Sequence, residues 1–152
     1  MASLIFHQTV AQAMMDALDA DVGATGCISL YTGAEGTDDA AIPAGTELVT
    51  VNFGSTAFGT AAITGSAGSR LCRITMQTET PAAPGATGTA ASFAIFKNQS
   101  TRTAGNMVIK GDVTTTAVGT GTLQLDATNL VSAGGNVDFD EANSYIQLAL
   151  NQ

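Results

Sequence analysis

Helical spacing occurs in one stretch of this chain, HQTVAQAMMDALDA at residues 7–20. We predict an α-helix over about residues 6–20, with Gly23 ending it and with Ser3 or Thr9 capping its start. Four apolar residues recur every four positions and are expected to form its apolar stripe: Phe6, Val10, Met14 and Leu18. Such a helix is expected to cover one end or face of a sheet.

The rest of the chain has the two-residue alternation of β-strands, interrupted by turns rich in Gly, Thr and Ser. The strongest strand is predicted at residues 89–97, where Phe93 and Ile95 alternate with Ser92 and Phe96. Further strands are predicted at residues 27–31, 47–53, 71–76, 107–113, 123–125 and 144–150, with weaker apolar pulses at 57–58 and 61–63.

About eight short strands without alternating helices predict antiparallel sheets rather than a parallel α/β fold. The expected fold class is mainly β: an antiparallel β-sandwich, jelly-roll-like, with one N-terminal α-helix. A chain of 152 residues is most simply one domain, so we expect a single β-sandwich domain over residues 1–152.

Charged residues make up only 12% of the chain, against about 25% in ordinary globular domains. Much of its 45% hydrophobic fraction is alanine, and aromatic residues contribute only 5%. We therefore expect a thin core and a weakly charged surface that suits packing against neighbouring subunits.

The net charge of −8 argues against a nucleic-acid partner, because phosphate binding needs a concentrated positive surface. All the basic residues lie between positions 70 and 110 of the chain: Arg70, Arg73, Lys97, Arg102 and Lys110. This uneven distribution has two possible consequences: acidic and basic faces of adjacent subunits meet, or the fold places acidic and basic side chains next to each other within one chain.

No stretch approaches the roughly 18 apolar residues of a membrane span, and the run Leu4–Phe6 is too short for a secretion signal. We expect no membrane partner.

Few residues could carry chemistry, and we expect neither an enzyme nor a cofactor. His7 is the single imidazole, and nothing in the sequence nominates an orienting acid or a nucleophile beside it. No zinc-ligand spacing occurs. Cys27 and Cys72 lie in strand-like runs and are expected to be buried free thiols, with a disulfide as the alternative.

One acidic cluster is the weak candidate for a metal site. Asp138, Asp140 and Glu141 follow a glycine pair and could hold Ca²⁺ if backbone carbonyls and a second loop, such as Asp38-Asp39, completed the shell. The cluster does not match the twelve-residue helix–loop–helix pattern, and a solvated acidic turn is the favoured interpretation.

Several motifs resemble small structural proteins of tailed bacteriophages. After the helix come Ile28-Ser-Leu-Tyr-Thr-Gly-Ala34 and Asp38-Asp-Ala-Ala-Ile-Pro-Ala-Gly45, followed by Leu48-Val49 and by Phe53 and Phe58. The family commonly has a strand that ends in Tyr-Thr-Gly and a loop leading to the second strand. The run Ala86-Thr-Gly-Thr-Ala-Ala-Ser-Phe-Ala-Ile-Phe-Lys97 is similar to its Ala-Thr-Gly-Thr-Ala strand. In the family a Gly-x-Val hairpin follows this strand, and Val108-Ile-Lys-Gly-Asp-Val113 is similar to it. Leu125 and Leu130 fall where the family's last hairpin would be.

The resemblance implies a virion protein, most simply a capsid decoration (cement) protein that binds the outer surface of the major capsid protein lattice and stabilises the head. Such proteins are often β-sandwich or jelly-roll domains that form homotrimers, and this one would be assembled in the host cytoplasm and located on the capsid surface. The alternatives are a tail, neck or collar protein of the virion and a carbohydrate-binding β-sandwich module. The absence of tryptophan, with only Tyr31 and Tyr145 as tyrosines, disfavours the carbohydrate module.

The expected partner contact is the short apolar segment before the helix, which would touch the shell or a sister subunit: Ala2, Ser3, Leu4, Ile5 and Phe6. Packing of this segment inside its own domain is the alternative.

Overall fold

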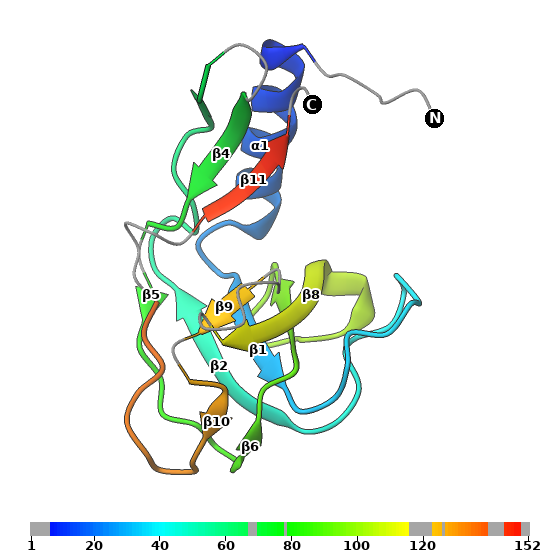
Figure 1. Ribbon diagram of the computed structural model, residues 1–152, viewed down its shortest axis with the longest axis vertical. Helices are drawn as coiled ribbons and strands as arrows, with labels where there is room; N and C mark the ends of the chain where they lie inside the picture. Colours follow the sequence, from blue (N-terminus) through cyan, green and yellow to red (C-terminus); the bar gives the residue numbers. More distant parts are fainter. Residues whose placement is uncertain are drawn as a thin grey trace.

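The chain is mainly β with one N-terminal helix, as the sequence predicts (Figure 1). The structure is a computed structural model that describes residues 7–66, 70–77, 79–115, 123–125, 127–139 and 145–149. The helices are α1 (Gln8–Val22) and the short 3-10 helix η1 (Ala104–Asn106). The strands are β1 (Cys27–Tyr31), β2 (Glu47–Phe53), β3 (Ala62–Thr64), β4 (Leu71–Thr75), β5 (Glu79–Thr80), β6 (Gly88–Thr89), β7 (Ser92–Phe96), β8 (Met107–Thr115), β9 (Leu123–Leu125), β10 (Asn129–Leu130) and β11 (Tyr145–Ala149).

The strands form three sheets among the described residues. The largest has six strands in the order β5-β2-β1-β7-β8-β9, the second has three in the order β11-β4-β3, and β10 pairs with β6. All these pairs are antiparallel except β8–β9, which is parallel and so departs from the expected all-antiparallel arrangement.

The two central strands of the large sheet, β1 and β7, are buried on both faces. On one face Ile28 lies opposite Val51 of β2 and Ile95 of β7, and these side chains belong to the main core. The other face carries a smaller apolar cluster: Cys27, Tyr31, Ala94 and Phe96, with Met107 against it. Burial on both faces agrees with the apolar side chains that β1 and β7 carry on both faces, with Ser29 and Ser92 as their buried polar residues.

Helix α1 packs against the three-stranded sheet, chiefly on β4 (Figure 1). The helix begins after His7, whose Nδ1 accepts a hydrogen bond from the Thr9 N–H at 3.3 Å. His7 is thus the N-cap, and the prediction that Thr9 caps the helix was wrong, while Ser3 lies outside the described residues. Gly23 ends the helix as predicted: its φ is 57° and its N–H donates to the Asp19 carbonyl at 2.8 Å.

The predicted apolar stripe of α1 is wrong in part, because Val10 and Met14 are 50% and 47% exposed. The buried side is made instead by Ala11, Met15 and Val22, with Leu18 packed at its edge. Three polar side chains next to this buried side fix the rotation of the helix, because they hold the segment before β3 by its backbone. Asp19 accepts from the Phe58 N–H at 2.9 Å, Asp16 accepts from the Ala61 N–H at 2.8 Å, and the Gln12 amide donates to the Ala61 carbonyl at 3.2 Å.

Candidate functional site

A long arm projects from the large sheet between β1 and β2, at the right of Figure 1. We define the arm as residues 32–46. Its base is closed by backbone hydrogen bonds from Thr32 N–H to the Thr46 carbonyl at 3.0 Å and from Gly33 N–H to the Ala44 carbonyl at 3.1 Å. Gly33 is required there, because a Cβ atom at this position would collide with the Ala44 carbonyl oxygen. The two ends of the arm are therefore hydrogen-bonded to each other, and the arm is a closed loop.

Lys110 on β8 holds the middle of the arm. Its ammonium group donates hydrogen bonds to three backbone carbonyls of the arm: to Glu35 at 2.9 Å, to Ala41 at 3.0 Å, and to Asp38. The Asp38 carboxylate in turn accepts from the Ala40 N–H at 2.9 Å. An ammonium has three N–H donors, so these three carbonyls satisfy it fully and tie the arm to the sheet.

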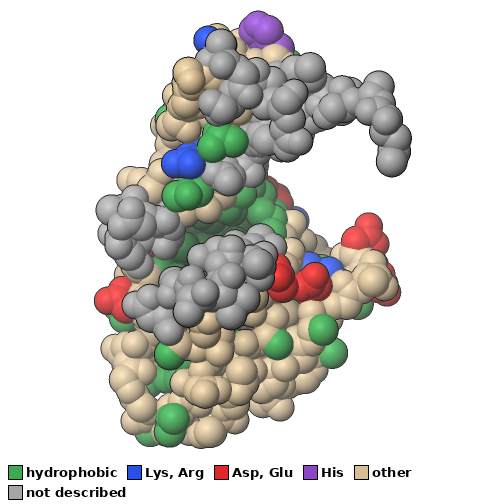
Figure 2. Space-filling model, viewed as in Figure 1, with side chains coloured by type: hydrophobic (Ala, Val, Ile, Leu, Met, Phe, Trp, Pro, Cys, Tyr) green, Lys and Arg blue, Asp and Glu red, His purple; other side chains and the backbone are tan. Residues whose placement is uncertain are grey.

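The surface of the arm is apolar at one point and acidic around it. Ile42 is 40% exposed, while Asp38 and Asp39 are exposed beside it, and Figure 2 shows acidic side chains gathered at the tip of the arm. Pro43 is buried, so one side of the arm packs inward. An exposed apolar side chain on a fixed support, flanked by charge, is suited to contact with another protein.

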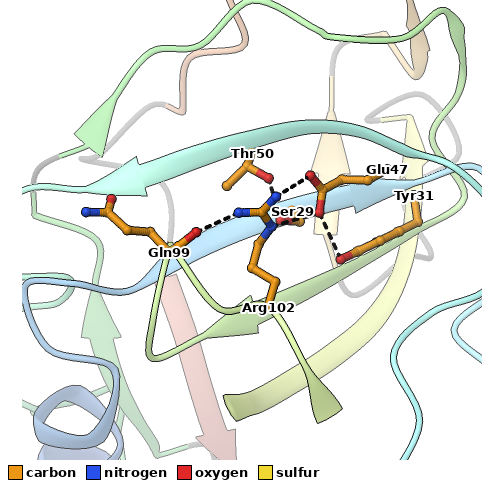
Figure 3. A network of polar contacts seen from close by, with 6 residues as sticks. All are labelled: Ser29, Tyr31, Glu47, Thr50, Gln99 and Arg102. Atoms are coloured by element: carbon orange, nitrogen blue, oxygen red, sulfur yellow. Dashed lines mark hydrogen bonds and ion pairs between the residues drawn. The ribbon is translucent and has the colours of Figure 1, made fainter. Parts of the chain in front are cut away.

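A polar network anchors the base of the arm at the two residues that flank it, Tyr31 and Glu47 (Figure 3). Arg102 donates through Nε and Nη2 to the two carboxylate oxygens of Glu47, each at 2.9 Å, and through Nη1 to the Gln99 carbonyl at 2.6 Å. The Tyr31 hydroxyl donates to Glu47 at 3.3 Å. The segment that carries Arg102 is thereby held over the outer face of β1 and β2.

The protonation states of this network follow from its contacts. Burial alone would raise the pKa of the Glu47 carboxyl, but hydrogen bonds from Arg102 and Thr50 and the charge of Arg102 outweigh it, so the pKa is lowered. Burial and the Glu47 charge raise the pKa of Tyr31 to about 12. Burial raises the pKa of the neighbouring Cys27 thiol to about 11. At neutral pH the network holds a carboxylate, a guanidinium and a neutral phenol, which suits a structural clamp.

The second exposed feature is the outward face of α1, which we define as Val10, Ala13, Met14, Ala17 and Ala20. All five residues are exposed and apolar, and Thr9, Asp16 and Asp21 are exposed on the same side of the helix. The outward side of α1 therefore mixes small apolar and polar side chains.

The sequence-predicted site residues fall in different places. Ala2–Phe6 lie outside the described residues, as do Asp140 and Glu141 of the calcium candidate. Asp138 is exposed, and no group of three or more His, Cys, Asp or Glu side chains that could hold a metal occurs among the described residues. Cys27 and Cys72 are free and buried, which confirms the thiol prediction.

The fold interleaves the two signs of charge within one chain. Lys97 lies 3.6 Å from Asp21, and Arg102 pairs with Glu47, so cations from the basic stretch at residues 70–110 meet anions of the first third. Arg73 covers the Tyr145 ring at 4.1 Å from the ring centroid. These contacts favour interleaving over the meeting of charged faces between subunits. No sequence signal marks the contacts of Lys110 with the arm or of Arg102 with Glu47, because these partners lie 55 to 75 positions away.

Comparison of the chain with protein-family models, curated proteins and solved structures finds no match. Among the described residues no helix is long and apolar enough to cross a membrane.

Proposed function

We propose that this chain is a structural protein of a tailed-bacteriophage virion, a capsid decoration (cement) protein that binds the outer surface of the major capsid protein lattice. The observation that carries the proposal is the arm: a long exposed loop that is held in one shape at its base and its middle. Loops longer than about 12–15 residues are uncommon in compact domains and are usually binding elements or disordered. This one is fixed by hydrogen bonds, which favours a binding element.

The arm would work by binding alone. A preformed loop loses less conformational entropy on docking than a flexible one, so more of its contact energy appears as affinity. Ile42 would enter an apolar depression of the shell, and the carboxylates of Asp38 and Asp39 would face basic side chains of the partner. By bridging adjacent capsid subunits, each copy would add contact area that resists the internal pressure of packaged DNA.

Three further parts of the proposal come from the sequence analysis and from the resemblance to phage virion proteins. The chain would act as a homo-oligomer, a trimer at threefold points of the lattice; its sheets would form a jelly-roll-like sandwich; and it would reside on the capsid surface without enzymatic chemistry. The mainly antiparallel sheets and the single N-terminal helix are consistent with this architecture.

The test is binding of the purified chain to phage heads that lack it. Heads and tails are separated, incubated with the chain and sedimented, and the bound chain is quantified against the major capsid protein. We expect saturable binding to heads, weakened at least tenfold by Ile42→Asp and unchanged by the control Val131→Asp, which alters a 60% exposed side chain outside the arm. Binding to tails alone would favour the tail or neck assignment, and binding to neither would refute a virion role.

A further inference from the structure

The middle of the arm surrounds one positive charge with backbone oxygens. The ammonium group of Lys110 supplies that charge. It donates to three carbonyls that are spaced three residues apart, those of Glu35, Asp38 and Ala41. The segment curls to bring these carbonyls together, because Gly36 has a left-handed φ of 71° and the Ala41 N–H donates to the Asp38 carbonyl at 3.3 Å. The three oxygens therefore converge on a single point.

The curled shape of this segment depends on a positive charge at that point. The arm contains three acidic residues, Glu35, Asp38 and Asp39, and no basic residue, so its carboxylates repel one another. The three converging carbonyls also present their negative ends to one another. A water molecule in place of the ammonium would carry no charge and only two donors for three acceptors. A cation is therefore the occupant that satisfies all three carbonyls and offsets both repulsions.

The oxygen ligands indicate the class of cation. Within the described part of the chain, the hydrogen-bond acceptors of the Lys110 ammonium are all neutral backbone carbonyls. Ca²⁺ and Mg²⁺ take carboxylate ligands at about 2.3–2.6 Å and about 2.0–2.1 Å. The Glu35 and Ala41 oxygens lie farther from the Lys110 nitrogen, at 2.9 and 3.0 Å. Neutral carbonyls at this distance suit a large monovalent cation, either an ammonium group or K⁺, which rings of backbone carbonyls bind in ion channels.

We propose that the middle of the arm is a binding site for a monovalent cation, formed by the carbonyls of Glu35, Asp38 and Ala41, with the Lys110 ammonium as its resident cation. The arm needs the charge rather than the tether to β8. A free ammonium or potassium ion therefore takes the place of the lysine side chain when that side chain is absent. The site is a property of the arm itself, and it stands or falls independently of the proposed virion role.

Cation rescue of Lys110→Ala tests the site, because this substitution removes the charge and leaves space for a free ion. The amides of Ala40 and Ala41, which are hydrogen-bonded to Asp38, report on the arm by hydrogen exchange. We expect them to exchange at least tenfold faster in Lys110→Ala than in the wild-type chain. Ammonium or potassium chloride should restore slow exchange, whereas choline chloride at the same ionic strength should not, because choline is too large. Lys97→Ala is the matched control and should exchange like the wild-type chain in every salt.

Lys110→Met distinguishes a bound ion from a general effect of salt, since its side chain removes the charge but still fills the space. We expect fast exchange in this variant that no salt corrects. Unchanged exchange in Lys110→Ala would overturn the proposal, and so would exchange that stays fast in every salt or that choline slows equally. If Lys110→Ala lowers the stability of the whole chain, the Tm decides. Ammonium or potassium should then raise its Tm more than that of Lys97→Ala, and equal shifts would overturn the site.

Chemical restoration of the side chain tests the charge separately. Lys110→Cys is alkylated with bromoethylamine, which rebuilds an ammonium group at the length of lysine, or with bromoethanol, which rebuilds the length with a neutral hydroxyl. Cys27 and Cys72 are buried and stay unmodified. We expect slow exchange of the Ala40 and Ala41 amides only after the bromoethylamine reaction. Equal exchange after both reactions would show that the arm does not need a positive charge there, and would overturn the proposal.

Discussion

Glu47→Gln removes the negative charge from the clamp at the base of the arm while keeping the shape of the side chain. In the native chain two N–H groups of Arg102 each donate to a Glu47 oxygen at 2.9 Å, and both side chains are only 31% exposed. Hydrogen bonds to charged groups contribute about 1.5–3 kcal/mol, whereas exposed ion pairs contribute about 0–1 kcal/mol. Since the amide keeps one acceptor, we expect a loss of about 1.5 kcal/mol of unfolding free energy at pH 7. For a chain of this length that loss corresponds to a fall in Tm of about 3–6 °C.

The loss should depend on pH with a defined sign. The folded-state pKa of Glu47 is lowered, so its ionised form stabilises the fold at pH values above the ordinary glutamate pKa of about 4.3. As the pH falls through the folded-state pKa, the carboxylate is protonated and this stabilisation disappears. The difference in Tm between the wild-type chain and Glu47→Gln should therefore be full at pH 7 and should shrink below about pH 4.

Thermal unfolding followed by circular dichroism at a series of pH values measures both quantities. Asp21→Asn is the control, because Asp21 and Lys97 are 3.6 Å apart with side chains 54% and 40% exposed, a geometry that contributes little in water. Equal Tm losses for the two variants, or a Glu47→Gln loss that persists unchanged in acid, would refute our account of the clamp.

Three further predictions concern the thiols, the helix anchor and the arm. Cys27 and Cys72 should react with a thiol reagent only after denaturation, because both are fully buried, and rapid labelling of the native chain would be inconsistent with the core. Asp19→Ala leaves the buried Phe58 N–H without its acceptor and should lower the unfolding free energy in urea by about 1–3 kcal/mol; an unchanged midpoint would contradict the anchor. Lys110→Met should increase proteolytic cleavage within the arm severalfold, whereas Lys97→Met should not, and equal cleavage of both would argue against the pinned arm.

Local elements could be predicted because their signals are local. The strands at residues 27–31, 47–53 and 123–125 have the predicted bounds, since apolar alternation and flanking glycines or polar turns set them. The strand predicted at residues 89–97 shortens to Ser92–Phe96, and the one at 107–113 extends to Thr115. Whether a segment forms a strand thus depends on residues adjacent in the sequence, whereas the residue at which the strand ends depends on pairing with strands that are distant in the sequence.

The orientation of α1 could not be predicted, because two overlapping sets of apolar residues share one helix. Val10 and Met14 recur with the same spacing as Ala11 and Met15, so periodicity alone allows either face inward. The choice depends on Asp19, and on its neighbours Asp16 and Gln12, whose partners are backbone groups of a loop far along the chain. Those contacts form only in the folded chain, so the periodicity of the helix sequence does not reveal them.

The arm could not be predicted as a candidate site either, because the contacts that fix it also join residues far apart in the sequence. The segment that becomes the arm reads as an ordinary polar loop, and nothing in its own residues indicates that it is fixed. Its hydrogen bonds come from Lys110, which contacts the arm itself, and from Arg102, which contacts Glu47 at its base, and both residues lie far along the chain. Of the acidic residues singled out as a calcium candidate, Asp140 and Glu141 lie outside the described residues.

The central claim is that this chain decorates the capsid by docking its arm. An electron cryomicroscopy reconstruction of the phage head, made with and without the chain, tests it most directly. We predict density of this fold repeated regularly over the outer face of the head lattice, with residues 32–46 in contact with the major capsid protein and with that density lost when the chain is absent. A head surface identical in both reconstructions, or copies confined to the neck or tail, would contradict the claim.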